Sequence, residues 1–235
     1  MRTALPVHYV EVEHIYQQLE KKHYRTISVT ACHGQSGTSL MAYALSKRYQ
    51  ADGYKVLLVD LNLQHPALDA YLGLPRKAWQ ADHSSSQCIT APSATGTHFL
   101  TAPTGKTASL SFRNQSAMHT TLGHWLEDYD RVILDTSPLN AKNYRNIPSD
   151  TVCGETDATL LMIASGKTTQ NQLEECCTEL QEVKANLVGC IMNDQHHPTL
   201  AAELIRETKR LKWLPPVARK LRSIIDNSSF LNLKV

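Results

Sequence analysis

The sequence predicts an α/β protein with a doubly wound, mostly parallel sheet and helices on both faces. Short apolar runs bounded by turn residues recur along the chain, and they are apolar on both sides, as strands buried between two layers are. Longer amphipathic stretches lie between these runs. The alternation continues over about 170 residues, which favours parallel strands joined by crossover helices.

The expected strands are short and rich in leucine or β-branched residues. They span residues 26–30, 55–61, 98–102, 131–136, 158–164 and 186–192. The helices between them are expected at 39–53, 114–130 and 168–185. The first of these helices ends at Gly53, and glycine is the residue type most common just after a helix.

The remaining segments have other patterns. Residues 75–97 are polar and rich in Ser and Thr, which predicts a loop with little regular structure, and residues 140–156 form a second irregular insert. We expect a helical segment at 1–24 and a basic helical tail at 196–235, which is either a solvated face or a surface for acidic lipid or a partner. No repeat or clean linker interrupts the chain, so we interpret residues 1–235 as a single domain.

The composition argues against a zinc-binding or membrane-spanning protein and gives no sign of a nucleic-acid-binding one. The chain has 235 residues, 20% charged residues and a net charge of +2, so nothing predicts a nucleic-acid partner. The six cysteines form no CxxC pair, which predicts reduced thiols rather than a zinc site. No run reaches the ~18 apolar residues of a membrane span, and the first residues lack an apolar signal core. We therefore expect a cytoplasmic protein.

The stretch "TACHGQSGTSL" (30–40) joins the first strand to the next helix. Gly34 and Gly37 allow the backbone to turn its N–H groups inward, as in a phosphate-binding loop. The helix begins at about Thr38, and its N-terminus attracts anions. Ser39 stands where the hydroxyl of such a loop holds Mg²⁺. A nucleotide site is thus predicted at the carboxyl edge of the sheet.

Other segments of the sequence make the resemblance to one family specific. "GQSGTS" lies without a gap over the loop P-G-E-G-K-S, "VLLVDLNLQHPALDAYLGL" resembles a Walker A′ segment, and "YDRVILDTSPL" resembles a Walker B segment. With "TDATLLMIASGKTTQNQL" and "ANLVGCIMND", these blocks make the chain similar to the bacterial tyrosine kinase (BY-kinase) family of exopolysaccharide synthesis. That family is a branch of the MinD/ParA-type P-loop ATPases.

The resemblance implies roles for individual residues. Catalytic roles fall to Asp60 and Asp135, and Mg²⁺ would be held by Ser39, Asp60 and Asp135. The nucleotide-binding set is Gly34, Gln35, Ser36, Gly37, Thr38, Ser39 and Asn193, of which Asn193 matches an asparagine that faces the base.

The chain departs from the family at charged positions. Thr38 replaces the P-loop lysine, and His33 stands near the position of the second, signature lysine. An ammonium about 4 Å from a phosphate charge is worth ~4 kcal/mol at an effective dielectric constant of ~20, so its loss could lower affinity a hundredfold. Asn62 replaces the second acid of Walker A′. The last tyrosine is Tyr144, so the acceptor tyrosines typical of the family's tail are absent.

The first helix also departs from the family. In place of the oligomer motif E-x-x-R-x-x-R it has Glu11, His14 and Gln17, which makes ring assembly in the family's manner doubtful and leaves self-association open.

These features predict a regulator or scaffold of capsule or exopolysaccharide biosynthesis in which ATP or ADP and Mg²⁺ bind weakly or not at all. The expected partner is a membrane polysaccharide co-polymerase or another polysaccharide-export protein, which would recruit the chain to the inner face of the membrane. One alternative is an active ATPase or tyrosine autokinase that uses Lys106 or Lys167. The other is a positioning protein of the MinD or pilus-localising type.

Overall fold

The computed structural model describes residues 9–92, 96–105 and 107–194, and it contains one six-stranded sheet in the order β3-β2-β4-β1-β5-β6. Every neighbouring pair of strands is parallel. The strands are β1 (Thr26–Ala31), β2 (Val56–Asp60), β3 (Thr97–Leu100), β4 (Arg131–Asp135), β5 (Ala158–Ala164) and β6 (Leu187–Asn193). The predicted doubly wound α/β fold is confirmed, and the strand ends lie within about two residues of the expected ones.

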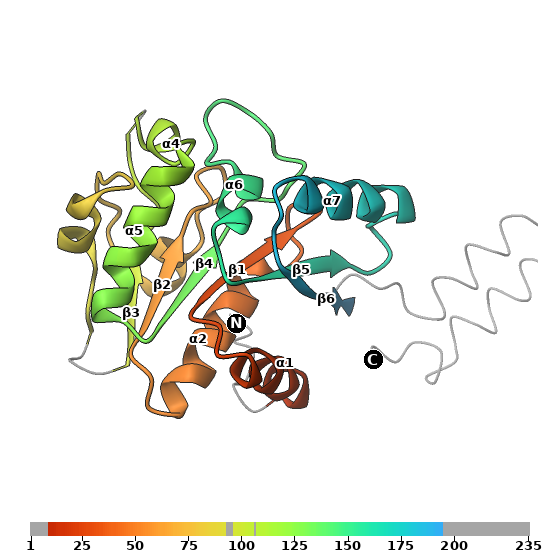
Figure 1. Ribbon diagram of the computed structural model, residues 1–235, viewed down its shortest axis with the longest axis horizontal. Helices are drawn as coiled ribbons and strands as arrows, with labels where there is room; N and C mark the ends of the chain where they lie inside the picture. Colours follow the sequence, from red (N-terminus) through yellow and green to blue (C-terminus); the bar gives the residue numbers. More distant parts are fainter. Residues whose placement is uncertain (1–8, 93–95, 106, 195–235) are drawn as a thin grey trace, which may run out of the picture. The chain divides into compact units, whose positions relative to one another are not determined.

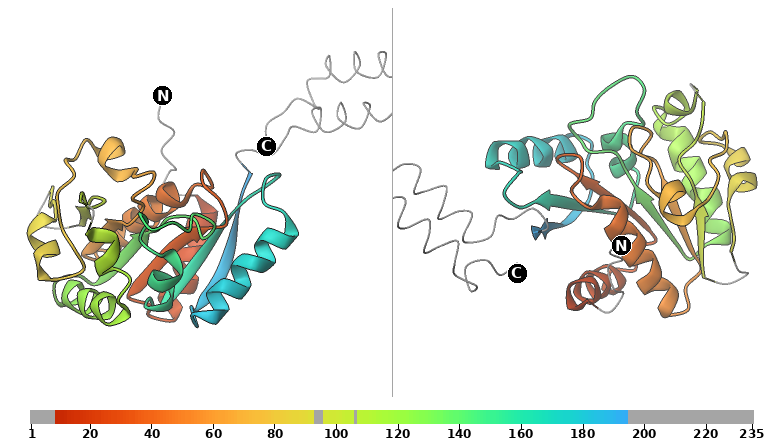
Figure 2. Two further views of the ribbon diagram at one scale, coloured as in Figure 1. Left: turned by 90° about the horizontal axis from the view of Figure 1, so that it is seen from above. Right: turned by 180° about the vertical axis from the view of Figure 1, so that it is seen from behind.

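Helices cover both faces of the sheet (Figures 1 and 2). On one face lie α1 (Val10–Lys21) and α2 (Thr38–Ala51), and on the other lie α5 (Gln115–Asp128), α6 (Ser149–Gly154) and α7 (Gln170–Glu182). Three short elements sit in the connections: α3 (Leu68–Leu72), the 3₁₀-helix η1 (His83–Cys88) and α4 (Ala108–Ser111).

The core divides along the alternation of side chains in each strand. In β2, Leu58 packs with Leu45 and Tyr49 of α2, whereas its neighbour Leu57 packs with Trp125 of α5 on the opposite face. All of these side chains are buried. Because both faces of the central strands are covered, the strands read as continuous apolar runs.

Two predicted irregular segments contain short helices. Within 140–156 the structure forms α6, so the expectation of an irregular insert is wrong for its second half. Val152 and Cys153 fix this turn of helix by packing into the core. Within 75–97 the short helix η1 forms, capped by the Asp82 carboxylate, which accepts from the N–H of Ser84. The expected tail at 196–235 lies outside the described residues.

Described residues up to Ala164 and from Thr168 to Asn193 form one compact unit. Ser165–Lys167 and Asp194 belong to a second unit whose other residues are not described. The single-domain interpretation of 1–235 therefore stays a prediction. Within the described ranges, the helices are too short or too polar to cross a bilayer.

A buried arginine joins α1 to the sheet. Arg131 is 7% exposed, and its Nη2 donates to both carboxylate oxygens of Glu20, at 2.9 and 2.8 Å. Its guanidinium also lies 4.3 Å from the ring centroid of Tyr54. A buried guanidinium needs such a counter-charge, because it cannot be deprotonated.

Replacing Glu20 should therefore destabilise the fold. We expect Glu20→Ala to lower the free energy of unfolding by about 2–4 kcal/mol, because it leaves Arg131 buried without its carboxylate. The matched control is Glu11→Ala on the exposed side of α1, which should change stability by less than about 0.5 kcal/mol. Urea unfolding followed by circular dichroism measures both, and equal midpoints for the two variants would contradict the role given to this pair.

Candidate nucleotide-binding site

The loop between β1 and α2 is a tight turn held by its own contacts. Gln35 and Gly37 have left-handed backbones, with φ of 63° and 90°. The Ser36 hydroxyl donates to the carbonyl of His33 at 2.8 Å. A Cβ at position 37 would lie 2.6 Å from Nδ2 of Asn193, so both the backbone conformation and the available space require glycine there.

The N-terminus of α2 is open toward this loop. Gly37 is its N-cap, and among the described residues no side chain caps the start of this 14-residue helix. These groups and the helix dipole favour an anion at this position. The predicted loop residues 34–39 are thus brought together at the carboxyl edge of the sheet, as the resemblance implies.

Asn193 reaches the loop from the end of β6. Its Nδ2 donates to the carbonyl of Ser36 at 3.0 Å, so the side chain holds the turn from behind. This contact joins two segments that are 157 residues apart in the sequence, and no sequence pattern predicts it. A contact of Asn193 with a base stays a prediction.

Two carboxylates lie side by side beneath the loop. Asp60 and Asp135 occupy paired positions at the ends of β2 and β4, and both are fully buried. Asp60 accepts from the backbone N–H groups of Asn62, Ala67 and Leu68, at 2.9, 2.9 and 3.2 Å. It thereby shapes the segment that leads into α3. Burial raises the pKa of Asp60, and these N–H groups act against that rise.

Asp135 has no such support. Neither of its carboxylate oxygens has a hydrogen bond of ordinary geometry with any described residue. Burial and the charge of Asp60 raise the pKa of Asp135 well above its usual range, and the nearby hydroxyls of Ser39 and Thr38 lower it only in part. A buried carboxylate with unsatisfied oxygens beside a serine hydroxyl is the donor set that Mg²⁺ prefers.

The residues that replace the family's other charged groups have local partners. Nδ1 of His33 lies 2.7 Å from Nδ2 of Asn140, on the loop that follows β4. The amide oxygen of Asn62 accepts from the N–H of His65 at 3.0 Å and from the hydroxyl of Ser137 at 3.2 Å. Both side chains therefore make local loop contacts at positions where the family has charged groups.

No cation is seen to replace the lysine within the described ranges. Lys142 pairs with Glu179 at 2.9 Å, and this contact raises the pKa of the lysine. The guanidinium of Arg145 donates through Nε to the hydroxyl of Tyr144 at 2.9 Å. Lys106 is not described, and Lys167 belongs to the second unit, so their recruitment stays a prediction.

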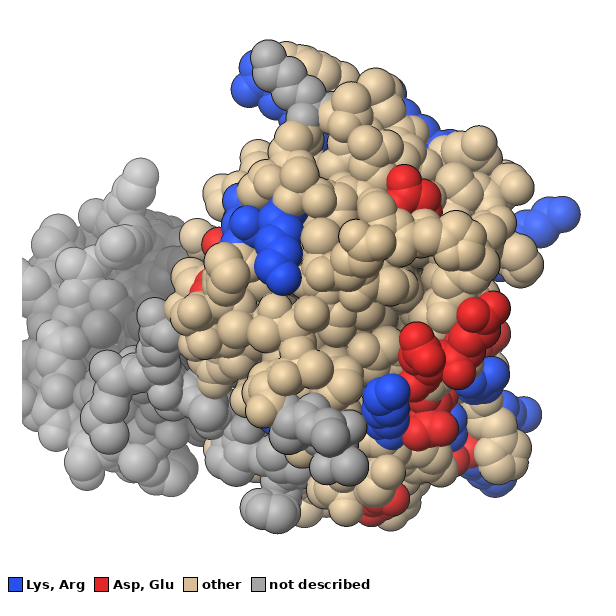
Figure 3. Space-filling view, turned by 90° about the vertical axis from the view of Figure 1, so that its left-hand side faces the viewer, with Lys and Arg blue, Asp and Glu red and all other residues tan. Residues whose placement is uncertain are grey.

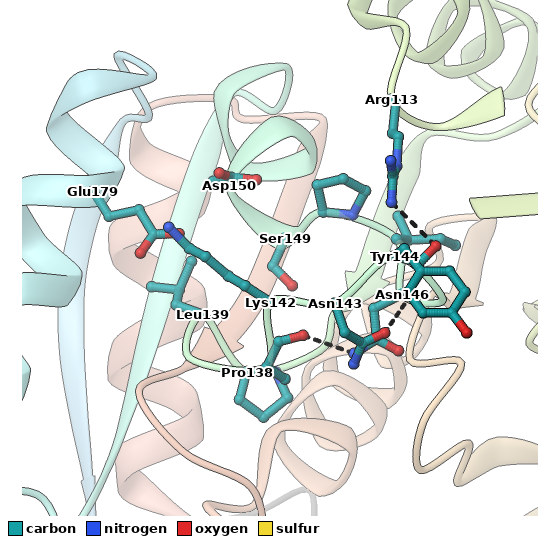
Figure 4. A pocket seen from close by; sticks show the side chains of 13 residues that line it. Arg113, Pro138, Leu139, Lys142, Asn143, Tyr144, Asn146, Ser149, Asp150 and Glu179 are labelled. Atoms are coloured by element: carbon teal, nitrogen blue, oxygen red, sulfur yellow. Dashed lines mark hydrogen bonds and ion pairs between the residues drawn. The ribbon is translucent and has the colours of Figure 1, made fainter. Parts of the chain in front are cut away.

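A cavity of about 410 Å³ adjoins the segment that follows Asp135. Figure 4 shows Leu139 and Pro138 at its floor, with the Lys142–Glu179 pair on one side and Tyr144 on the other. The Tyr144 carbonyl accepts from Nη2 of Arg113 at 3.1 Å, which fixes this part of the rim. The cavity contains none of the predicted site residues, so sequence motifs did not reveal it.

On the side of β3 and η1 the surface is mostly uncharged, and the Lys, Arg, Asp and Glu side chains that it carries are mixed in small groups (Figure 3). This face lacks the continuous basic surface with which proteins bind the phosphates of nucleic acids.

Comparison with known proteins shows which proteins this chain resembles. The chain matches no model of a known protein family. It is 28% identical over 176 residues to the tyrosine-protein kinase YwqD of Bacillus subtilis, which covers 72% of each chain. It is 22% identical over 185 residues to the tyrosine-protein kinase CpsD of Streptococcus pneumoniae, covering 75% of this chain and 78% of that one. The chain is therefore similar in sequence to bacterial tyrosine kinases of the BY-kinase family.

Solved structures agree with this placement at the level of the fold. The chimerical protein CapA2B2 superposes with a TM-score of 0.69 at 20% identity, covering 82% of this chain and 90% of that one. The kinase domain of the Escherichia coli tyrosine kinase ETK gives 0.67 at 18% identity and 85% of each chain. Cobyrinic acid a,c-diamide synthase of Mycobacterium smegmatis, with bound ADP and magnesium, gives 0.59 at 19% identity, covering 72% and 74%. The chain thus has the MinD/ParA-type P-loop fold.

The state of Asp135 gives a testable pH dependence. Because its pKa is raised in the folded protein, the fold binds a proton more tightly than the unfolded chain does, and stability falls as pH rises from about 4 through the folded pKa. Asp135→Asn removes this loss, so it should raise the melting temperature at pH 8 without divalent cations by about 2 °C or more. Magnesium should raise the melting temperature of the unsubstituted protein and not that of the variant.

The control for this experiment is Asp128→Asn, at an exposed carboxylate at the end of α5. It should leave both the pH dependence and the magnesium response unchanged. A magnesium shift that survives Asp135→Asn would show that Asp135 does not hold the ion.

Proposed function

We propose that this BY-kinase relative is a regulator or scaffold of capsule or exopolysaccharide biosynthesis that has lost efficient ATP hydrolysis and tyrosine-kinase activity. Its relatives carry the name tyrosine-protein kinase, which supports a role in the same system. The finer role follows from the chemistry of its own loop.

One observation carries the proposal: the shape of an anion site is present and its cation is missing. The open N-terminus of α2, the glycine at position 37 and the unsatisfied Asp135 carboxylate are all in place. Thr38 supplies a neutral hydroxyl where a lysine would neutralise the β- and γ-phosphates. The developing charge in phosphoryl transfer needs that cation more than the ground state does, so rate suffers more than affinity.

Nucleotide and Mg²⁺ would sit together in this proposal. The phosphates would meet the N–H groups of residues 34–39, and the ion would meet the oxygens of Ser39 and Asp135, while Asp60 orients its neighbours through backbone contacts. Binding would be weak, because two buried carboxylates face the phosphates without an ammonium between them.

The proposed partner is a membrane polysaccharide co-polymerase or another polysaccharide-export protein. The proposal includes a cytoplasmic location and recruitment to the inner face of the membrane by that partner. It rests on the similarity to BY-kinases.

The competing function is a working ATPase or autokinase. The retained Asp135, with oxygens free to take Mg²⁺, favours it, because a decayed site has no need of this costly carboxylate. It requires Lys106, Lys167 or a partner's cation to reach the phosphates.

Restoring the lysine tests the missing charge. By titration calorimetry with ATP and magnesium, we expect weak binding by the natural sequence and binding about a hundredfold tighter by Thr38→Lys. Thr120→Lys adds the same charge on the exposed side of α5 and should have no effect. Tight binding by the natural sequence would contradict a decayed site.

Turnover separates the two functions. We expect no ADP production by the natural protein above the level of Asp135→Asn, with or without the cytoplasmic part of its co-polymerase partner. Steady ADP production that Asp135→Asn abolishes would identify a working enzyme. A coupled assay for ADP measures both.

A further inference from the structure

Four of the six cysteines converge beside the nucleotide loop. Cys32 follows β1 and opens the loop, Cys176 and Cys177 lie on α7, and Cys190 lies on β6. Leu161 of β5 pairs with Cys190, which places that cysteine on the face of the sheet that α7 covers. Cys32 and Cys176 are buried, at 0% and 6% exposure, whereas Cys190 is exposed.

Cys32 and Cys176 pack in the same buried cluster, and their thiols interact. Both belong to the cluster that α7 forms against the sheet, with Leu161 and Leu180 around them. The Cys176 thiol donates to Cys32, which lowers the pKa of Cys32 and raises that of Cys176. Cys32 is therefore the more acidic thiol of the pair and the one that more readily forms the nucleophilic thiolate. Burial instead raises the pKa of Cys153, in the same cluster, to about 12, so that thiol is inert.

We propose that Cys32 and Cys176 are a reversible oxidation site that forms a disulfide between the nucleotide loop and α7 on exposure to peroxide. All six cysteines are unpaired in this structure. Reversible disulfides that form on oxidation are the kind expected of a cytosolic protein.

The chemistry is a two-electron oxidation by hydrogen peroxide. The Cys32 thiolate attacks one peroxide oxygen, the O–O bond breaks, and Cys32 becomes a sulfenic acid while hydroxide leaves. The Cys176 sulfur then attacks the Cys32 sulfur, the S–O bond breaks, and the S–S bond forms. The hydroxide that leaves the sulfenic acid takes the Cys176 proton, and the hydroxide from the first step takes the proton that Cys32 lost on ionising, so two thiols and one peroxide give one disulfide and two waters.

Such a bond would act on the loop because of where Cys32 lies. It is the first residue after β1, two residues before Gly34, and the other end of the loop is fixed by α2. Drawing Cys32 from thiol contact to the length of a covalent bond displaces the N–H groups that follow it. We expect this to weaken ATP binding, a consequence that rests on the proposed nucleotide site.

The test maps the bond first. The full chain is treated with hydrogen peroxide, its remaining thiols are blocked, and peptides are identified by mass spectrometry without reduction. The expected product links Cys32 to Cys176, dithiothreitol reverses it, and the melting temperature of the oxidised protein rises by about 5 °C or more. A Cys177–Cys190 link alone, or no disulfide, would overturn the proposal.

Cysteine variants show which residues cause the rise in melting temperature. Cys176→Ser and Cys32→Ala should each abolish the rise in melting temperature, while Cys88→Ala, a half-buried cysteine on η1, should keep it. Calorimetry with ATP and magnesium should show affinity about tenfold lower after oxidation and unchanged in oxidised Cys176→Ser. If the disulfide is mapped but the affinity for ATP does not change, the oxidation site is confirmed and its proposed effect on nucleotide binding is contradicted. Absence of ATP binding in the reduced protein would count against the proposed nucleotide site alone and would leave the mapped disulfide standing.

Discussion

Two buried carboxylates in adjacent parallel strands impose the main constraint on this molecule. Asp60 and Asp135 face one another at the edge where the loop and α2 meet, and burial opposes the charge of each. Such a pair is tolerated when something positive lies near it: backbone N–H groups, a proton, a metal ion or an ammonium. Asp60 has three backbone N–H groups. Asp135 has none from the described part of the chain, and this difference decides what the site can do.

The fold was predictable because its signal is local and repeated. Strands such as 158–164 are apolar on both faces, and this pattern survives any change in the site. The short helices were missed for a physical reason. α6 has six residues, so too few turns exist for periodicity to show, and burial of Val152 and Cys153 holds it in place. Tertiary packing, which no local window contains, created these elements.

The site was predictable only in outline. Motif order located the loop and both aspartates, and the structure brings them together. Their unequal roles were not visible, because the N–H groups that Asp60 accepts come from a connection whose path depends on the whole fold. Two other interactions likewise join segments more than 140 residues apart: the hydrogen bond from Asn193 to the carbonyl of Ser36, and the interaction of Cys32 with Cys176. Spacing in sequence carries no information about such contacts.

Loss of the lysine changes the role of Asp135 as well as that of the loop. With an ammonium present, an ionised Asp135 would be stabilised whether or not magnesium is bound. With Thr38 there, the hydroxyls near Asp135 offset burial only in part, so proton and metal compete for the same oxygens. In the proposed function, magnesium would compete with a proton at Asp135, so its binding would be weaker at low pH and tighter as pH rises.

A nucleotide that arrived with its own magnesium would bring the missing positive charge with it, so the metal would supply part of what the lysine supplies in the family. This coupling would favour binding of the complex over binding of either component, and it would leave the transferred phosphoryl group without a cation of its own. Under this proposal, the site would sense magnesium nucleotide more readily than it would consume it.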